Sequence, residues 1–175
     1  MAAEGVPHLV LVGLAGSGKT TIGRGLAERL GREFLDIDQE ILRREGKSNV
    51  GEVFRARGEA YFRQLEADIT QELAKKTSMV IAPGGGWIMT PRSVEAMRPV
   101  SYLIYLKVAP ETALERIGAD VGNRPLLDHP DPLGELQHML AVRGPKYEEA
   151  DLIVDAGQAS ATDVIDQLIA RIKVS

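Results

Sequence analysis

The sequence predicts an α/β protein whose five-stranded parallel sheet is flanked by helices. Short apolar runs rich in β-branched residues alternate with amphipathic segments along the whole chain, which is typical of a doubly wound parallel sheet. A glycine-rich loop between the first apolar run and the first helical segment carries a phosphate-binding motif. We expect a single domain over residues 1–175, since this length suffices to bury one core.

The glycine-rich loop at residues 13–20 reads Gly-Leu-Ala-Gly-Ser-Gly-Lys-Thr and matches the pattern G-x-x-x-x-G-K-[ST]. An expected strand over 8–12 precedes it, and an expected helix over 21–30 follows. Glycines admit backbone conformations closed to other residues, so that loop amides and the helix N-terminus surround an anion. Lys19 is expected to contact the outer phosphates, and the Thr20 hydroxyl to bind Mg²⁺. The motif predicts binding of a nucleoside triphosphate.

A second strand is expected over 32–38, with Asp36 and Asp38 at its carboxyl end. Alternation along a strand would place both carboxylates on the same side. Ligands of open α/β sheets lie at the carboxyl ends of the strands. We therefore expect one carboxylate near Mg²⁺ and the other facing the phosphate acceptor, the alternative being a solvated strand end without a function.

The remaining elements are expected in regular alternation. They are helices over 39–45 and 50–73 (broken around Gly46 and Gly58), a strand over 78–82, a helix over 91–97, a strand over 101–106, helices over 110–117 and 133–143, a strand over 152–154 and a helix over 161–172.

Arg63 and Glu66 lie three residues apart, on one face of the helix expected over 50–73. One interpretation is a surface ion pair of little consequence. The other is an arginine that binds a substrate carboxylate, for which a planar guanidinium is suited, and that Glu66 orients. The spacing alone favours the surface pair.

Two further segments lack regular structure. Gly84, Gly85 and Gly86 directly follow a strand, where they leave room for a ligand against the main chain, although a flexible connector is the alternative. Residues 118–132 show no periodicity and contain Arg124, which predicts a mobile lid. An arginine on such a lid would close over the phosphates and stabilise the charge of the transferred group.

The composition excludes several classes of function. The net charge of −4 argues against nucleic-acid binding, which needs a basic surface. No apolar run reaches membrane-spanning length, and no signal peptide opens the chain. The absence of cysteine excludes disulfides, thiolate metal sites and cysteine nucleophiles. These features fit a cytoplasmic protein.

With these residues identified, the sequence resembles the shikimate kinase family over nearly its whole length. The matching segments are residues 13–20, 34–38, 58–66, 84–86 and 124–127, and Arg143 followed by Tyr147. The resemblance implies a three-layer P-loop kinase fold and transfer of the γ-phosphate of ATP to the 3-hydroxyl of shikimate, a step of aromatic amino-acid biosynthesis. It also implies Mg²⁺ as cofactor, ATP, ADP and shikimate as ligands, and a monomer.

The resemblance assigns roles to individual residues. The nucleotide-binding set is Gly13, Ala15, Gly16, Ser17, Gly18, Lys19, Thr20, Thr21, Arg116 and Arg124, with Arg116 against adenine. The shikimate-binding set is Asp38, Arg63, Gly84, Gly85, Gly86 and Arg143, within which the two arginines bind the carboxylate and the segment 39–66 contributes to acceptor binding. The resemblance also implies that Thr20 binds Mg²⁺ directly and that Asp36 binds it through water. The catalytic residues are Lys19, Asp38 and Arg124; whether Asp38 takes the acceptor's proton stays open.

Two residues depart from the family pattern. Pro83 stands where a small or hydroxyl residue is usual, and Trp87 stands where a small aliphatic residue is usual. The indole is either harmless packing or a change in the acceptor pocket that would favour another acceptor. The rival functions are another small-molecule kinase, such as a gluconate-kinase-like protein, and a ligand-sensing domain. The presence of Lys19, Asp38 and Arg124 disfavours the sensor.

Overall fold

The computed structural model describes residues 7–118 and 124–174, and its strands form one parallel sheet. The strands are β1 (His8–Val12), β2 (Phe34–Asp36), β3 (Val80–Ala82), β4 (Ser101–Lys107) and β5 (Leu152–Asp155). Their order is β2-β3-β1-β4-β5, and every neighbouring pair is parallel. The five-stranded parallel sheet with flanking helices confirms the predicted fold class.

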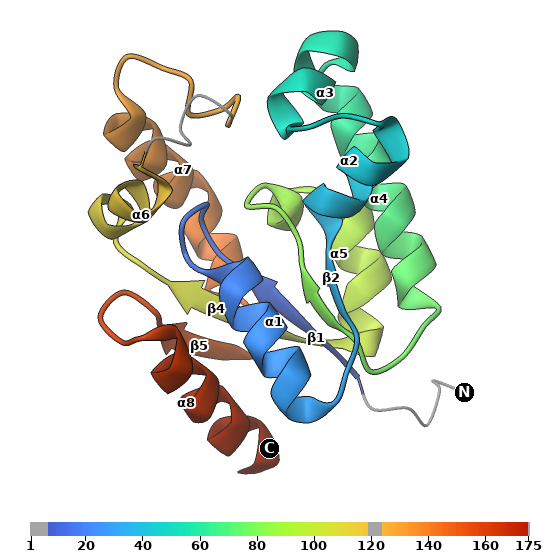
Figure 1. Cartoon of the computed structure of the whole chain (residues 1–175), viewed down its shortest axis with the longest axis vertical. Helices are drawn as coiled ribbons and strands as arrows, with labels where there is room; N and C mark the ends of the chain where they lie inside the picture. The colour runs from blue at the N-terminus through green and yellow to red at the C-terminus, as the bar shows by residue number, and fades with distance from the viewer. Residues whose placement is uncertain (1–6, 119–123, 175) are drawn as a thin grey trace.

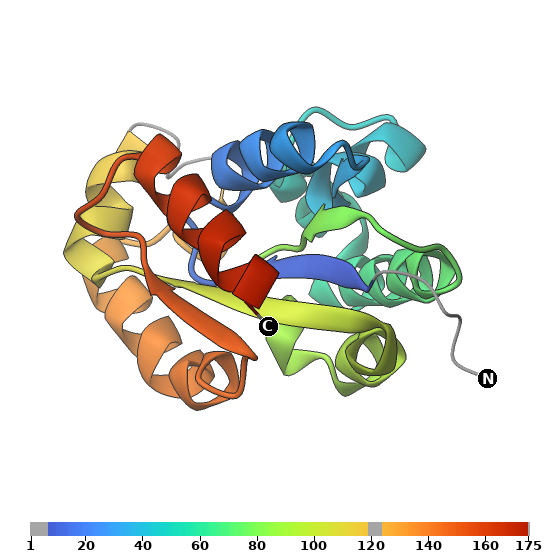
Figure 2. The same cartoon turned by 90° about the horizontal axis from the view of Figure 1, so that it is seen from below.

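Helices connect the strands and cover both faces of the sheet. They are α1 (Lys19–Leu30), α2 (Ile37–Glu45), α3 (Val50–Arg57), α4 (Glu59–Ala74), α5 (Pro91–Met97), α6 (Pro110–Ile117), α7 (Pro132–Tyr147) and α8 (Ala161–Val174), with 3₁₀ turns η1 (Trp87–Met89) and η2 (Arg98–Val100). Figure 2 shows α1 and α8 on one face of the sheet and α5 and α7 on the other. Within the described residues, no helix is long and apolar enough to cross a lipid bilayer.

The core forms two layers because β1 is buried on both faces. Leu9 and Leu11 pack in one apolar cluster with residues of α1 and α8, and Val10 and Val12 pack in a second cluster with residues of α2, α4 and α5. A strand covered on both faces has a continuously apolar sequence, as the run at residues 8–12 does.

Strand β1 is the central strand of the sheet. The loop that follows it therefore lies at the middle of the edge formed by the carboxyl ends of the strands. The chain passes from β1 to β2 and β3 on one side, and then to β4 and β5 on the other. In such sheets ligands bind at the carboxyl ends of the strands where this reversal occurs. Figure 1 shows α2 and α3 on one side of the loop after β1, and α6 and α7 on the other.

The strand expected over 32–38 was too long, and Asp38 lies on a helix instead. Strand β2 ends at Asp36, which is the N-cap of α2, and its Oδ1 accepts a hydrogen bond from the backbone N–H of Gln39 at 3.0 Å. A capping aspartate stabilises the start of a helix, so that the helix begins before the strand reaches residue 38. The argument from strand alternation was therefore wrong.

Helix α7 continues to Tyr147, past the predicted end at Arg143 and through Pro145. The Gly144-Pro145 pair predicted a break because proline cannot donate the backbone hydrogen bond of a helix interior. The Tyr147 side chain is fully buried, and its ring stacks on that of Tyr105 with centroids 5.0 Å apart. Tertiary packing thus holds the last turn of α7 in place.

The other predicted elements occur with small shifts of their ends. The long helical stretch is divided at Gly46 and Gly58, as predicted, where the backbone φ values are +64° and +87°. Residues 124–131 contain neither helix nor strand, in agreement with the irregular segment expected over 118–132. Residues 119–123 of that segment lie outside the described residues.

Candidate active site

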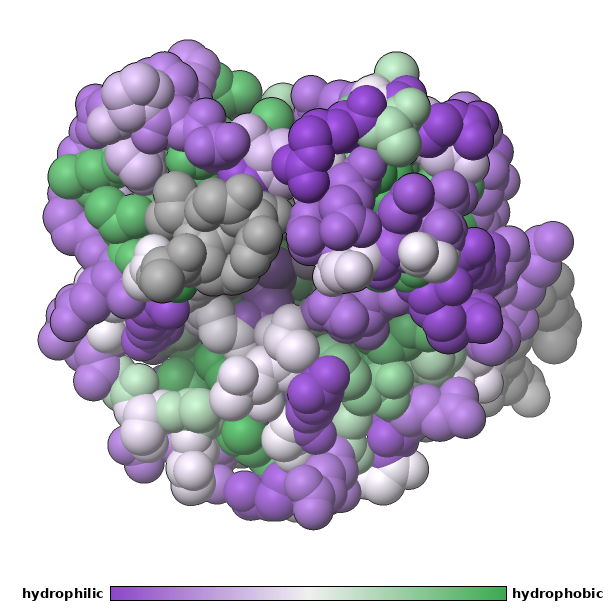
Figure 3. Space-filling model, turned by 45° about the horizontal axis from the view of Figure 1, so that its top comes forward, coloured by the Kyte–Doolittle hydropathy of each residue, from purple (hydrophilic) through white to green (hydrophobic). Residues whose placement is uncertain are grey.

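A cleft of about 840 Å³ opens at the carboxyl edge of the sheet. Its walls include the loop after β1, the junction of β2 and α2, the glycines after β3, residues 124–127 and the loop after β5, together with side chains of α3, α4, α6 and α7. Figure 3 looks onto this face, where hydrophilic side chains lie around a hollow. Segments that are distant in sequence therefore contribute to one site.

The loop after β1 has the backbone geometry that its glycines predict. Gly16 and Gly18 have φ values of +81° and +94°, which side chains disfavour. The Lys19 amine donates hydrogen bonds to the carbonyl oxygens of Gly13 at 2.7 Å and Leu14 at 2.9 Å. Burial lowers the pKa of Lys19 to about 8, against the opposing charge of Asp38.

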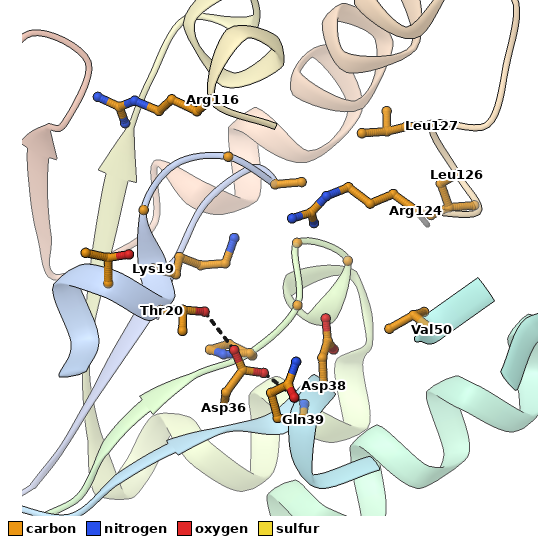
Figure 4. Close-up of a pocket in the computed structure, with 18 of the residues that line it drawn as sticks. Lys19, Thr20, Asp36, Asp38, Gln39, Val50, Arg116, Arg124, Leu126 and Leu127 are labelled. Atoms are coloured by element: carbon orange, nitrogen blue, oxygen red, sulfur yellow. Dashed lines mark hydrogen bonds between the residues drawn. The ribbon is translucent and has the colours of Figure 1, made fainter. Parts of the chain in front are cut away.

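Thr20 and Asp36 form a fixed pair beside this loop. The Thr20 hydroxyl donates to Asp36 Oδ2 at 2.7 Å, while Asp36 Oδ1 accepts from the Gln39 backbone N–H at 3.0 Å (Figure 4). Hydroxyl and carboxylate oxygens are ligands that Mg²⁺ accepts. Among the described residues, no group of three or more histidine or carboxylate side chains is placed to hold a metal ion. Thr20 and Asp36 could together contribute oxygen ligands to such an ion.

Asp38 presents an unsatisfied carboxylate oxygen in the cleft. Its Oδ1 is buried and has no hydrogen-bond partner within the described part of the chain. Burial and then the nearby Asp36 raise the pKa of Asp38 to about 6, although Lys19, Arg63 and Arg124 oppose the shift. Because a buried, unpaired acceptor is costly, this oxygen is suited to accept a hydrogen bond from a bound hydroxyl group.

Each glycine of the run 84–86 lies against a different side chain of the predicted acceptor site. A β-carbon on Gly84 would lie 2.8 Å from Asp38 Oδ1, and one on Gly85 would lie 3.1 Å from an Arg143 nitrogen. A β-carbon on Gly86 would clash with the Arg63 guanidinium. The absence of three side chains thus lets one carboxylate and two guanidinium groups lie directly on the main chain.

Arg63 pairs with a fully buried Glu66 while its own side chain is 21% exposed, so the interpretation as a surface ion pair was wrong. Both carboxylate oxygens of Glu66 lie 3.1 Å from Arg63 Nη1, and the Glu66 side chain is 0% exposed. Burial raises the pKa of Glu66 to about 7, and the neighbouring Arg63 opposes this shift. The carboxylate binds Nη1 of the guanidinium, Nη2 lies 3.5 Å from Glu59 Oε1, and the Arg63 side chain also lines the cleft.

Tyr147 holds the glycine run from the side of α7. Its hydroxyl donates a hydrogen bond to the Gly85 carbonyl at 2.5 Å. Burial raises the pKa of Tyr147, and Arg143 opposes this shift. Tyr147 was expected only as a residue that follows Arg143 in the matching pattern, whereas in the structure its side chain contacts the glycine run.

The nucleotide end of the cleft includes a loop that sequence reasoning missed. Arg116 donates to the Ala156 carbonyl at 2.7 Å, and residues of the loop after β5, among them Ala159 and Ser160, line the cleft. The sequence feature that could have identified this loop is its position after the carboxyl end of a parallel strand, where ligands bind in such sheets. Its small, uncharged residues carried no recognisable motif.

The cleft brings together most of the predicted site residues. Those that line it are Ala15, Gly16, Gly18, Lys19, Thr20, Thr21, Asp36, Asp38, Arg63, Gly84, Gly85, Gly86, Arg116, Arg124 and Arg143. Gly13 and Ser17 do not line it: Gly13 supplies a carbonyl to Lys19, and Ser17 is fully buried. Figure 4 shows Lys19, Asp38 and Arg124 directed into the same part of the cleft.

Of the two departures from the family pattern, only Pro83 lines the cleft. Trp87 is 1% exposed and packs in the apolar cluster with residues of α4 and α5. The indole therefore lies in the core, which agrees with the packing interpretation. Apolar residues that sequence reasoning did not assign also line the acceptor end, including Val50, Phe54 and Phe62.

Known proteins resemble this chain in sequence and in fold. A sequence model of the family described as Shikimate kinase matches residues 15–173. A shikimate kinase from Symbiobacterium thermophilum is 40% identical over 168 residues, which cover 95% of this chain and 96% of that relative. The solved shikimate kinase from Acinetobacter baumannii in complex with shikimate is 38% identical, with a TM-score of 0.92 over 97% of this chain and 94% of its own.

The rival gluconate kinase is more distant. A gluconokinase structure from Sinorhizobium meliloti 1021 is 20% identical, with a TM-score of 0.59 over 94% of this chain and 90% of that chain. This likeness extends to the fold alone.

Proposed function

The chain belongs to the shikimate kinase family, and from this membership we propose that it transfers the γ-phosphate of ATP to the 3-hydroxyl of shikimate, giving shikimate 3-phosphate and ADP. The observation that carries the proposal is the contact of the glycines 84–86 with Asp38, Arg143 and Arg63. It supplies two cations for a carboxylate and one acceptor for a hydroxyl within one small pocket. This set suits a compact hydroxy acid.

The phosphate end of the cleft suits phosphoryl transfer. In this reaction a protein mainly aligns the reactants and stabilises charge. The amides of the loop 13–20 would bind the phosphates, and Lys19 and Arg124 would neutralise the charge that develops on the transferred group. Thr20 and, through water, Asp36 would hold Mg²⁺, which would offset the negative charge of the phosphates when bound.

The acceptor end orients the nucleophile. Arg63 and Arg143 would bind the shikimate carboxylate, with the ring against the glycine run. Asp38 would then accept a hydrogen bond from the reacting hydroxyl and turn it toward the γ-phosphate. With its pKa raised to about 6 by burial, Asp38 is charged at neutral pH and suited to this role.

We infer that the protein acts as a monomer with one functional domain over residues 1–175. Its ligands are ATP, ADP and shikimate.

The proposal is tested by ADP release with ATP and Mg²⁺, comparing shikimate, quinate, gluconate and no acceptor. We expect turnover with shikimate that exceeds the other three by more than a hundredfold. Faster turnover with gluconate would favour the rival kinase. Nucleotide binding without any acceptor-dependent turnover would favour the sensor.

A further inference from the structure

The only tryptophan of the chain joins the glycine run to helix α4 through a buried hydrogen bond. Trp87 directly follows Gly86, and its indole Nε1 donates to Thr70 Oγ1 at 3.0 Å. Both side chains are buried, at 1% and 0% exposed. The Thr70 hydroxyl in turn donates to the backbone carbonyl of Glu66 at 2.7 Å, one helical turn earlier.

These contacts close a ring around the acid-binding side chain. The Glu66 carboxylate holds Arg63 at 3.1 Å, and the Arg63 guanidinium lies where a β-carbon on Gly86 would be. The ring therefore runs from Gly86 to Trp87, Thr70, Glu66, Arg63 and back to Gly86. Moving the glycine run relative to α4 would break the indole bond or separate Gly86 from Arg63.

We propose that Thr70 and Trp87 are positioning residues that set the distance between Arg63 and the glycine run, and thereby determine the affinity for the acceptor carboxylate. This inference rests on the proposed function of Arg63. Within the described residues the indole N–H donates to Thr70, so removal of the Thr70 hydroxyl leaves a buried donor unsatisfied unless the loop or the helix moves. Small displacements of a binding group are costly because bidentate hydrogen bonds depend strongly on geometry.

The test uses paired variants of α4. Thr70→Val removes the hydroxyl at nearly constant volume, and Thr70→Ser keeps it. Ile69→Val is the matched control, since Ile69 is 1% exposed on the same helix and loses only a methyl group. We expect Thr70→Val to lower kcat/KM for shikimate about tenfold, the equivalent of one buried hydrogen bond. Thr70→Ser, Ile69→Val and the KM for ATP should stay within about twofold of wild type.

A double-mutant cycle separates positioning from a general loss of structure. In an Arg63→Ala background, Thr70→Val should change kcat/KM for shikimate less than twofold, because the side chain that the ring positions is gone. Equal losses in both backgrounds would overturn the inference, as would a Thr70→Val protein that behaves like Ile69→Val. If Thr70→Val does not fold, Trp87→Phe, which lacks the indole N–H, replaces it under the same criteria.

Fluorescence gives a readout of binding that does not require turnover. Because Trp87 is the only tryptophan, tryptophan emission reports on the surroundings of this one side chain, which belongs to the ring of contacts. Shikimate should change the emission of the wild-type protein, and the titration of Thr70→Val should require about tenfold more shikimate. Wild-type protein that neither binds nor phosphorylates shikimate would overturn the proposed function. Active wild-type protein with unchanged Thr70→Val kinetics and binding would overturn only the inference.

Discussion

The guanidinium of Arg63 occupies the space that a β-carbon on Gly86 would fill. Gly86 has φ −87° and ψ −5°, a conformation that is common in type I turns and compatible with most residue types. Close approach of a side chain, and not backbone freedom, therefore explains the glycine at this position. The same reasoning applies to Gly84 against Asp38 and to Gly85 against Arg143.

Gly86→Ala should reduce kcat/KM for shikimate by ten- to a hundredfold. The added methyl group displaces Arg63 from the main chain, while the backbone conformation accepts alanine. Steady-state kinetics with varied shikimate and varied ATP check this, and the KM for ATP should not change. Gly144→Ala is the control, since its β-carbon would meet nothing closer than 3.8 Å. Wild-type kinetics for Gly86→Ala would contradict the role of this contact.

Lys19→Met should lower kcat at least a thousandfold and leave the fold intact. The variant removes the amine that neutralises the phosphates, and methionine retains most of the side-chain volume. ADP release measures the activity, and circular dichroism verifies the fold. A folded variant with near-normal kcat would show that the loop 13–20 is not the phosphate site.

In a plot of kcat/KM for shikimate against pH, the fall on the acid side (the acid limb) should reflect protonation of Asp38. Its pKa is raised to about 6 by burial and Asp36, so the carboxylate takes up a proton as the pH falls through that value. Below pH 6, kcat/KM for shikimate should fall about tenfold per pH unit. Glu66→Gln should retain an acid limb, because Asp38 remains titratable, but its midpoint should move to lower pH because the variant removes a carboxylate that interacts with Asp38. Loss of the limb in Glu66→Gln would assign it to Glu66.

Glu66 should make the wild-type protein less stable as the pH rises from about 4.5 to about 7. Burial raises its pKa in the folded state from 4.5 to about 7, so the folded protein holds the proton more tightly than the unfolded chain. This contribution to stability is complete below pH 4.5 and is lost as the pH passes 7.

Urea unfolding of wild type and Glu66→Gln at pH 4.5 and pH 7.5 measures this effect. The free energy of unfolding of the wild type should fall relative to the variant by on the order of 3 kcal/mol over this interval. A difference between the two proteins that is independent of pH would contradict the assignment.

The phosphate end of the site was predictable because it is local. The glycines, Lys19 and Thr20 lie in eight consecutive residues between a strand and a helix, and the backbone geometry of such a loop follows from its residue types. The fold class was predictable for a similar reason, since buried strands and amphipathic helices leave a periodic pattern.

The acceptor end depended on contacts that sequence spacing does not encode. Arg63 and Glu66 showed the spacing of an ordinary surface pair, and only the complete burial of Glu66 distinguishes the two interpretations. Asp38 lies in a helix because Asp36 caps the N-terminus of α2 and thereby ends strand β2. Tyr147 extends α7 through its packing on Tyr105, which lies on a strand far away in the sequence.

The position of phosphate on the product tests the central claim most directly. Two-dimensional phosphorus–proton NMR of a reaction with ATP, Mg²⁺ and shikimate identifies which ring carbon bears the new ester. With the carboxylate held by Arg63 and Arg143 and Asp38 on the reacting hydroxyl, we predict a single product, shikimate 3-phosphate. A phosphate on another hydroxyl, a mixture of esters, or no phosphorylated shikimate would contradict this account of the acceptor site.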